Sequence, residues 1–157
     1  MRIFTALALA SLSWASAAKA QSVELSGHVK QAAHLAIADL KALPAETLEV
    51  SFETSHGTSH GSFVGVKLWA LIERAGLADT EGRHPDLRHT VEIHARDGYR
   101  IVMSLGEIDP ELGDKGVILA YSKDGQALPE ADAPRLIVAG DKHGAREVRA
   151  VDRITID

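Results

Sequence analysis

The sequence predicts an α+β fold in which β-strands dominate, with one clear helix and a few short helical turns. Two observations predict it. Short strand-like runs alternate with turn signals along most of the chain, and a single stretch carries the apolar spacing of an amphipathic helix. No internal repeat, low-complexity tract or long linker divides the 157 residues, so we expect one folded domain.

The beginning of the chain predicts a cleavable signal peptide. A positive start at Arg2 is followed by an apolar run over residues 3–14 and by Ala18-Lys19-Ala20, the small-x-small pattern of a cleavage site. We therefore assign residues 1–20 to a signal peptide and residues 21–157 to a single domain exported to the periplasm. No cysteine is available for a lipid anchor, and a lone arginine does not signal the twin-arginine route.

Composition excludes several classes of function. The chain carries 17 Lys and Arg against 22 Asp and Glu, and cleavage would remove two of the basic residues, Arg2 and Lys19. An acidic protein is a poor partner for nucleic acid or for an anionic membrane, so neither is expected. The sequence has no cysteine, which excludes thiol catalysis, iron–sulfur clusters and cysteine-based zinc sites.

The first half of the domain contains two predicted strands and the best helix. Residues 23–29 and 47–52 read as strands, and residues 37–43 between them as one or two helical turns before a proline. After Gly65, the chain has apolar residues at helical spacing and then a glycine suited to a C-terminal cap. These residues are Leu68, Leu71, Ile72, Ala75 and the capping Gly76.

The second half consists of strands joined by turns. Residues 90–95 alternate in polarity, Asp97-Gly98 predicts a tight turn, and residues 99–103 return as the partner strand. Further strands are expected at residues 117–121, 135–139 and 148–156, the first of them an almost continuous apolar run.

Four segments, taken in order, resemble a known family. They are residues 23–29 with the Leu40–Pro44 run, residues 62–72, residues 119–138, and residues 140–154. The last, Gly140-Asp141-Lys142-His143-Gly144-Ala145-Arg146-Glu147-Val148, is the most specific. The chain resembles the oxidoreductase molybdopterin-binding domain of sulfite oxidases. The resemblance implies a β-rich, mixed-sheet sulfite-oxidase-type molybdopterin-binding fold.

The resemblance also implies a binding site in the last segment. In the family, a glycine-rich loop approaches the pterin and basic side chains beyond it meet the phosphate of the cofactor. Glycines permit close backbone approach and basic side chains bind anions, so the residues themselves fit this role. The alternative is a turn with solvated charges on an edge strand. The candidate cofactor-binding residues are Gly140, Lys142, His143, Gly144, Arg146 and Arg149.

The metal ligand of the family is missing. The resemblance implies molybdenum held by two dithiolene sulfurs of the cofactor and one cysteine thiolate, a soft ligand that suits this metal. The matching loop, which we place at Phe52–Gly61, has no cysteine, and the register puts Glu53 or Thr54 nearest the vacant position. Export in the unfolded state also argues against a working molybdenum centre, because this cofactor is normally inserted in the cytoplasm. We therefore expect no catalytic residue and no protein-held metal. No cofactor is expected from the residues themselves, and molybdopterin is implied only by the resemblance.

The same loop offers a different candidate metal site. His56 and His60 are four residues apart, a spacing that would bring both imidazoles to one face of a helix. Gly57 and Gly61 oppose a helix, however, and a third ligand is not evident. Solvated loop histidines are the alternative interpretation.

Three hypotheses follow from the sequence. The first is an exported, non-catalytic binding or accessory protein that uses the glycine-rich basic loop for an anionic small molecule or a periplasmic protein partner. The second is a periplasmic molybdopterin-dependent oxidoreductase. The third is a metal-binding protein that uses His56 and His60.

Overall fold

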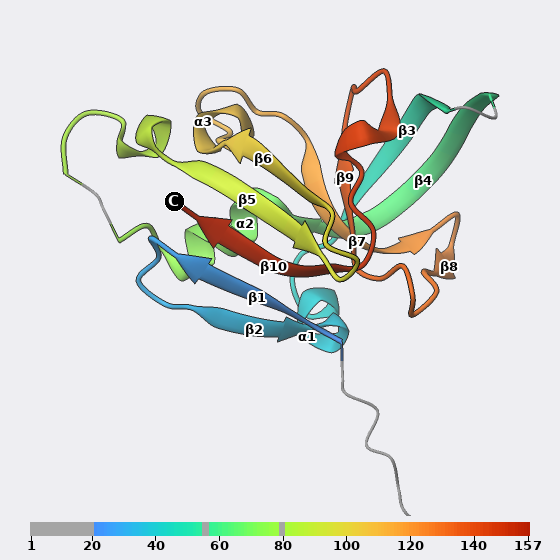
Figure 1. Cartoon of the computed structure of the whole chain (residues 1–157), viewed down its shortest axis with the longest axis horizontal. Helices are drawn as coiled ribbons and strands as arrows, with labels where there is room; N and C mark the ends of the chain where they lie inside the picture. The colour runs from blue at the N-terminus through green and yellow to red at the C-terminus, as the bar shows by residue number, and fades with distance from the viewer. Residues whose placement is uncertain (1–20, 55–56, 79–80) are drawn as a thin grey trace, which may run out of the picture.

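The computed structural model describes residues 21–54, 57–78 and 81–157 (Figure 1). The predicted signal peptide, residues 1–20, lies outside the described residues. None of the helices in the described part of the chain is long and apolar enough to cross a membrane.

Among the described residues, the first sheet contains five strands, which come from the beginning, the middle and the end of the sequence (Figure 1). Its central pair is parallel, β1 against β10, and all its other pairs are antiparallel. Alternate residues of β1, β5 and β10 are buried, as expected for strands with one face on the core. In spatial order the strands are β2 (Ala33–Ala36), β1 (Ser22–Gly27), β10 (Val151–Ile156), β5 (Thr90–Ala95) and β6 (Arg100–Ser104).

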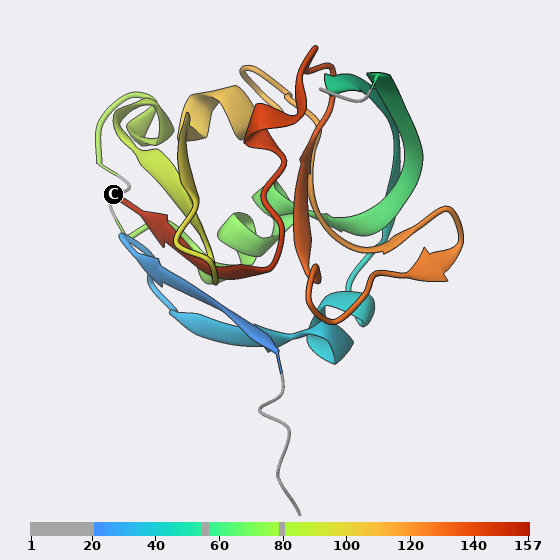
Figure 2. The same ribbon diagram turned by 45° about the vertical axis from the view of Figure 1, so that its right-hand side comes forward.

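The second sheet is antiparallel and is built on a long hairpin, which curves strongly in Figure 2. The hairpin strands are β3 (Glu46–Thr54) and β4 (Gly57–Lys67), and β4 also pairs with β7 (Val117–Lys123). On its other side β7 pairs with both β8 (Gln126–Ala127) and β9 (Arg135–Val138). The β4–β7 register shifts between Val64 and Gly65, where the ladder is irregular.

Short helices connect and cover the strands. The longest is α2 (Leu68–Ala75), whose apolar stripe is buried and whose C-cap is Gly76. The others are α1 (Ile37–Lys41), α3 (Leu105–Ile108), η1 (Pro85–Arg88) and η2 (Gly144–Arg146).

The core divides into two parts on opposite faces of the second sheet. Side chains alternate along a strand, so β7 sends Val117 and Leu119 into the main core with α2 and the first sheet. Ile118 and Ala120 point the other way, into a smaller cluster around Phe63. Burial on both faces explains why β7 is almost continuously apolar.

The structure confirms the predicted fold class and most of its elements. The helix at 68–75, the helical turn after residue 37 and the strand at 90–95 lie where the sequence predicted them. The short elements β2 and α3 were not predicted. The interpretation of Phe52–Gly61 as a loop was wrong, because residues 52–54 and 57–61 are paired strand residues of the β3–β4 hairpin.

Candidate functional site

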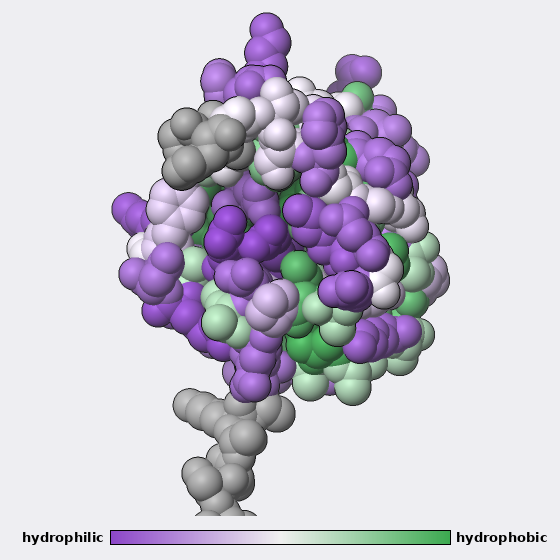
Figure 3. Space-filling model, turned by 90° about the vertical axis from the view of Figure 1, so that its right-hand side faces the viewer, coloured by the Kyte–Doolittle hydropathy of each residue, from purple (hydrophilic) through white to green (hydrophobic). Residues whose placement is uncertain are grey.

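Phe63 and Phe52 of the smaller cluster line a cavity of about 420 Å³. This volume lies within the range of about 300–1,000 Å³ that is typical of small-molecule sites. The cavity is enclosed by the β3–β4 hairpin, the end of β7, the start of β9 and the segment from His143 to Arg149. Figure 3 views the molecule from the side of this hairpin, and the surface there is hollowed and hydrophilic near its centre.

The hairpin contributes one of its two faces to the cavity. Phe52 and Ser59 are directly paired, line the cavity and lie on the same face as Phe63. Glu53 borders the cavity but belongs to the alternate face. Its Oε1 accepts a hydrogen bond from Thr58, the residue directly opposite it, at 2.9 Å. The carboxylate nearest the vacant ligand position is thus engaged in a hydrogen bond across the hairpin.

A buried arginine forms the back of the cavity. Arg135 is 7% exposed, and on β9 it shares a face with Ile137, which belongs to the smaller cluster. Its guanidinium lies 2.7 Å from a carboxylate oxygen of Glu147 and 3.3 Å from one of Asp132. Burial lowers the pKa of Arg135, and the two carboxylates oppose that effect. Its Nε is buried without a hydrogen-bond partner among the described residues.

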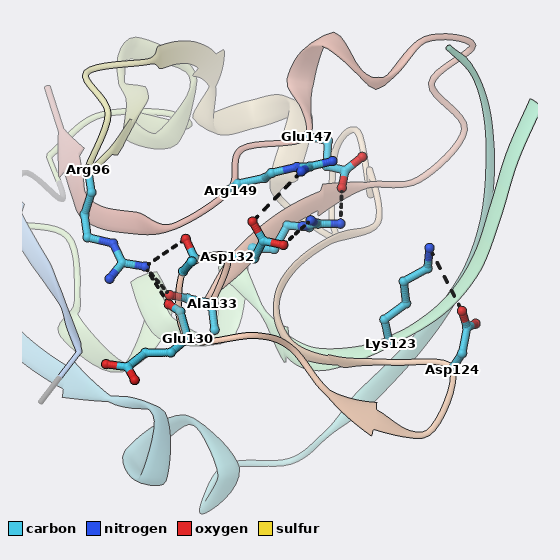
Figure 4. A network of polar contacts seen from close by, with 10 residues as sticks. Arg96, Lys123, Asp124, Glu130, Asp132, Ala133, Glu147 and Arg149 are labelled. Atoms are coloured by element: carbon cyan, nitrogen blue, oxygen red, sulfur yellow. Dashed lines mark hydrogen bonds and ion pairs between the residues drawn. The ribbon is translucent and has the colours of Figure 1, made fainter. Parts of the chain in front are cut away.

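Two further cations on the wall are only loosely paired (Figure 4). Arg149 approaches Asp132 at 3.9 Å and its side chain is 65% exposed. Lys123 approaches Asp124 at 4.0 Å. The Arg149 charge also lowers the pKa of Arg135, so the two guanidinium groups are close enough to repel. An anion placed between them would relieve that repulsion.

A glycine makes room for one of these cations. A β-carbon at Gly61 would lie 2.5 Å from Cε of Lys123, so the lysine stem crosses β4 where no side chain blocks it. Nζ of Lys123 lies 5.4 Å from the centroid of the Phe63 ring, a distance at which a cation is attracted to an aromatic face. The ring and the glycine together hold Lys123 over the cavity.

The structure places some of the predicted site residues at the cavity and others away from it. His143, Gly144 and Arg149 lie on the cavity wall, and Gly144 packs against the Phe52 ring. Gly140 has the positive φ of 72° that its loop requires. Lys142 is exposed, and its carbonyl oxygen accepts a hydrogen bond from the Glu53 amide at 2.8 Å.

Arg146 lies outside the cavity wall and is held by two carboxylates. Its Nε and Nη2 donate to Asp141 at 2.8 and 2.6 Å, and its Nη1 donates to Glu107 at 2.9 Å. These charge-assisted hydrogen bonds raise its pKa and tie η2 to α3. Its guanidinium is thus occupied by structural contacts.

The same contacts predict a dependence of stability on pH. The hydrogen bond from Arg146 lowers the pKa of Asp141 below its ordinary value of 3.8, and burial partly offsets this. A carboxyl with a lowered pKa contributes stability that is complete above the unfolded value and is lost as the pH falls through the folded value. Denaturant titrations should therefore show wild type more stable than Asp141→Asn at pH 6. The difference should shrink below pH 4, and an equal difference at both pH values would contradict the assignment.

The structure brings together no other site that the sequence suggested. His56 lies outside the described residues, and His60 is an exposed residue of β4 paired with Ser51. Among the described residues, no three His, Cys, Asp or Glu side chains form a group that could hold a metal. Ser59 and His143 share the cavity, but within the described part of the chain no hydrogen bond joins them as a nucleophile and its base.

Sequence reasoning missed Arg135 and Lys123 as site residues. Arg135 lies in a segment that was assigned as a strand for its apolar pattern, and Lys123 lies just after the strand predicted at residues 117–121. The signal for Arg135 was present, because a charged residue at the start of an otherwise fully buried strand needs a partner or a ligand. No comparable signal marks Lys123, whose place over the cavity depends on Gly61 in a distant segment.

Fold and site together define a small β-rich domain of the sulfite oxidase type with a cation-lined cavity on its second sheet. The family model for the oxidoreductase molybdopterin binding domain matches residues 12–157, and the chain belongs to this family. A search of curated proteins finds no match.

A solved structure shares the fold. The crystal structure of the sulfane dehydrogenase SoxCD from Paracoccus pantotrophus matches with a TM-score of 0.70 at 22% identity. The match covers 86% of this chain and 37% of that chain, so this chain spans little more than a third of the length of that protein.

The side chains at the cavity fit only part of the cofactor that the family name implies. Arg149, Lys123 and the buried Nε of Arg135 suit an anionic group such as a phosphate. The donors near the vacant ligand position do not suit molybdenum held as the family holds it. The sequence supplies no thiolate, and the carboxylate of Glu53 accepts a hydrogen bond from Thr58.

Proposed function

We propose that this protein is an exported, non-catalytic binding domain that takes an anionic small molecule, or an acidic group of a periplasmic protein partner, into the cavity. The observation that carries the proposal is the weak pairing of two cations on the cavity wall, Arg149 and Lys123. Arg149 and Lys123 line the cavity, and among the described residues their nearest carboxylates lie at 3.9 and 4.0 Å, so an incoming anion does not have to displace a close partner.

Isothermal titration with phosphate, sulfite, sulfate and pterins tests the small-molecule form. We expect saturable binding of at least one probe. Arg149→Ala and Lys123→Ala should each weaken it by roughly tenfold or more, because each removes a charge-assisted contact. Arg100→Ala is the matched control, since Arg100 is an exposed cation on β6 that does not line the cavity. If no probe binds, the small-molecule form is wrong.

The second candidate is a periplasmic molybdopterin-dependent oxidoreductase, favoured by the match of the family model to residues 12–157. A mass measurement on native, undenatured protein, combined with molybdenum analysis, separates the two candidates and also tests export. The binding-domain proposal expects a mature chain that starts at Gln21, without molybdenum. One molybdenum per chain would favour the oxidoreductase, and a retained N-terminal segment would contradict export.

A further inference from the structure

A second cavity lies beside the first, and the two meet at a row of cations. The second cavity has a volume of about 580 Å³ and opens between the β7–β8 turn and the segment that leads to β9. Three residues line both cavities, namely Lys123, Arg135 and Arg149. All three carry positive charge. We call this shared boundary the cationic ridge.

Carboxylates flank the cationic ridge on both sides. Glu147 and Glu53 lie on the side of the first cavity, and Asp132 and Asp124 lie on the side of the second. Arg135 is already neutralised by Glu147 and Asp132. The remaining attraction comes from Arg149 and Lys123 and falls off toward either cavity, where the carboxylates repel negative charge. The ridge therefore favours one localised anionic charge rather than an extended polyanion.

Away from the ridge, each cavity wall also includes uncharged residues. The first has the Phe52 ring and the Ser59 hydroxyl, and the second has Ala127, Leu128 and Pro129. Such walls suit uncharged organic groups better than further phosphates or carboxylates. A ligand that filled both cavities would thus carry its charge in the middle, at the cationic ridge, and uncharged groups at both ends.

We propose that the ligand is a molecule with a single internal anionic group between two uncharged parts, for which a phosphodiester is the simplest chemical class. This inference rests on the proposed function, because it assigns the anion of that same site to the cationic ridge. Each uncharged part occupies one cavity.

Three phosphate probes test the position of the charge by isothermal titration with the full chain. Bis(p-nitrophenyl) phosphate is a diester with an internal charge, p-nitrophenyl phosphate is a monoester with a terminal charge, and inorganic phosphate has no organic group. The diester should bind more tightly than the monoester by roughly tenfold, because only the diester fills both cavities around one charge.

Two matched variants test the use of both cavities. Ala145→Trp fills the first cavity from η2, and Ala127→Trp fills the second from β8. Both alanines are exposed lining residues, so the fold should tolerate the larger side chain. Each variant should weaken the diester by roughly tenfold, whereas the monoester should respond to only one of them. Unchanged thermal unfolding would show that each variant is folded.

The outcomes separate this inference from the proposed function. The proposal of an internal anionic group is wrong if the monoester binds at least as tightly as the diester. It is also wrong if either tryptophan variant leaves the affinity for the diester unchanged. Anion binding at the site would still stand in that case, provided that Arg149→Ala weakens every probe. If none of the three probes binds, the inference fails together with the small-molecule form of the proposed function.

Discussion

Arg135→Ala should lower the free energy of unfolding by about 3–5 kcal/mol, the usual cost of removing one partner from a buried ion pair. The guanidinium is 7% exposed and lies between Glu147 and Asp132. Its removal leaves the Glu147 carboxylate, whose side chain is 11% exposed, without a cation at close range. An uncompensated buried charge is far more costly than the loss of a surface contact.

Urea titration of wild type and variant measures this effect, and two further variants make it specific. Arg100→Ala removes a cation that is 66% exposed on its side chain, and should cost no more than about 1 kcal/mol. The double variant Arg135→Met with Glu147→Gln removes both charges, and should recover much of the loss. A cost below 1 kcal/mol for Arg135→Ala, or no recovery in the double variant, would contradict a buried charge pair.

The second large effect on stability is expected at Gly65, where β4 pairs with β7. A β-carbon there would lie 2.4 Å from the Leu119 carbonyl oxygen and 2.5 Å from Cα of Ala120. Both atoms are backbone, so no side-chain rotation can relieve the clash. Gly65→Ala should therefore destabilise the protein at or beyond the upper end of the range of about 1–3 kcal/mol for overpacking.

Gly98→Ala is the control for this substitution. Gly98 has a positive φ of 89° but nothing within 4 Å of a β-carbon, so its replacement tests backbone strain alone. Gly98→Ala should lower the free energy of unfolding by about 1 kcal/mol. Thermal unfolding of both variants gives the comparison. Gly65→Ala as stable as Gly98→Ala would show that β4 and β7 can separate without loss.

The elements that could be predicted are those whose signal is local. The α2 stripe and the alternation of β5 depend on side chains within one segment, and both were recovered. The β3–β4 hairpin was missed at its tip because Gly57, Ser59 and Gly61 have the composition of a loop. Their strand conformation comes from cross-strand pairing with β3, from Glu46 opposite Gly65 to Thr54 opposite Gly57. Tertiary pairing here overrides local preference.

In the candidate site, too, the residues with a local signal could be predicted and those placed by distant contacts could not. His143, Gly144 and Arg149, which line the cavity, could be proposed because they sit in one glycine-containing basic segment. Arg146 belongs to that segment as well, yet its partner Glu107 lies 39 residues away, and spacing alone does not reveal such a contact. Arg135 is placed at the cavity by the alternation of β9, which separates it from the main core.

The position of β10 imposes an order of assembly. This last strand lies between β1 and β5, so without it the first sheet is two disconnected hairpins. A polypeptide that emerges N-terminus first cannot join them until residues 151–156 are free, and such distant pairing is inherently slow. Nascent molecules should therefore stay accessible to chaperones and proteases until β10 has been made, and removal of β10 should abolish cooperative folding of the domain.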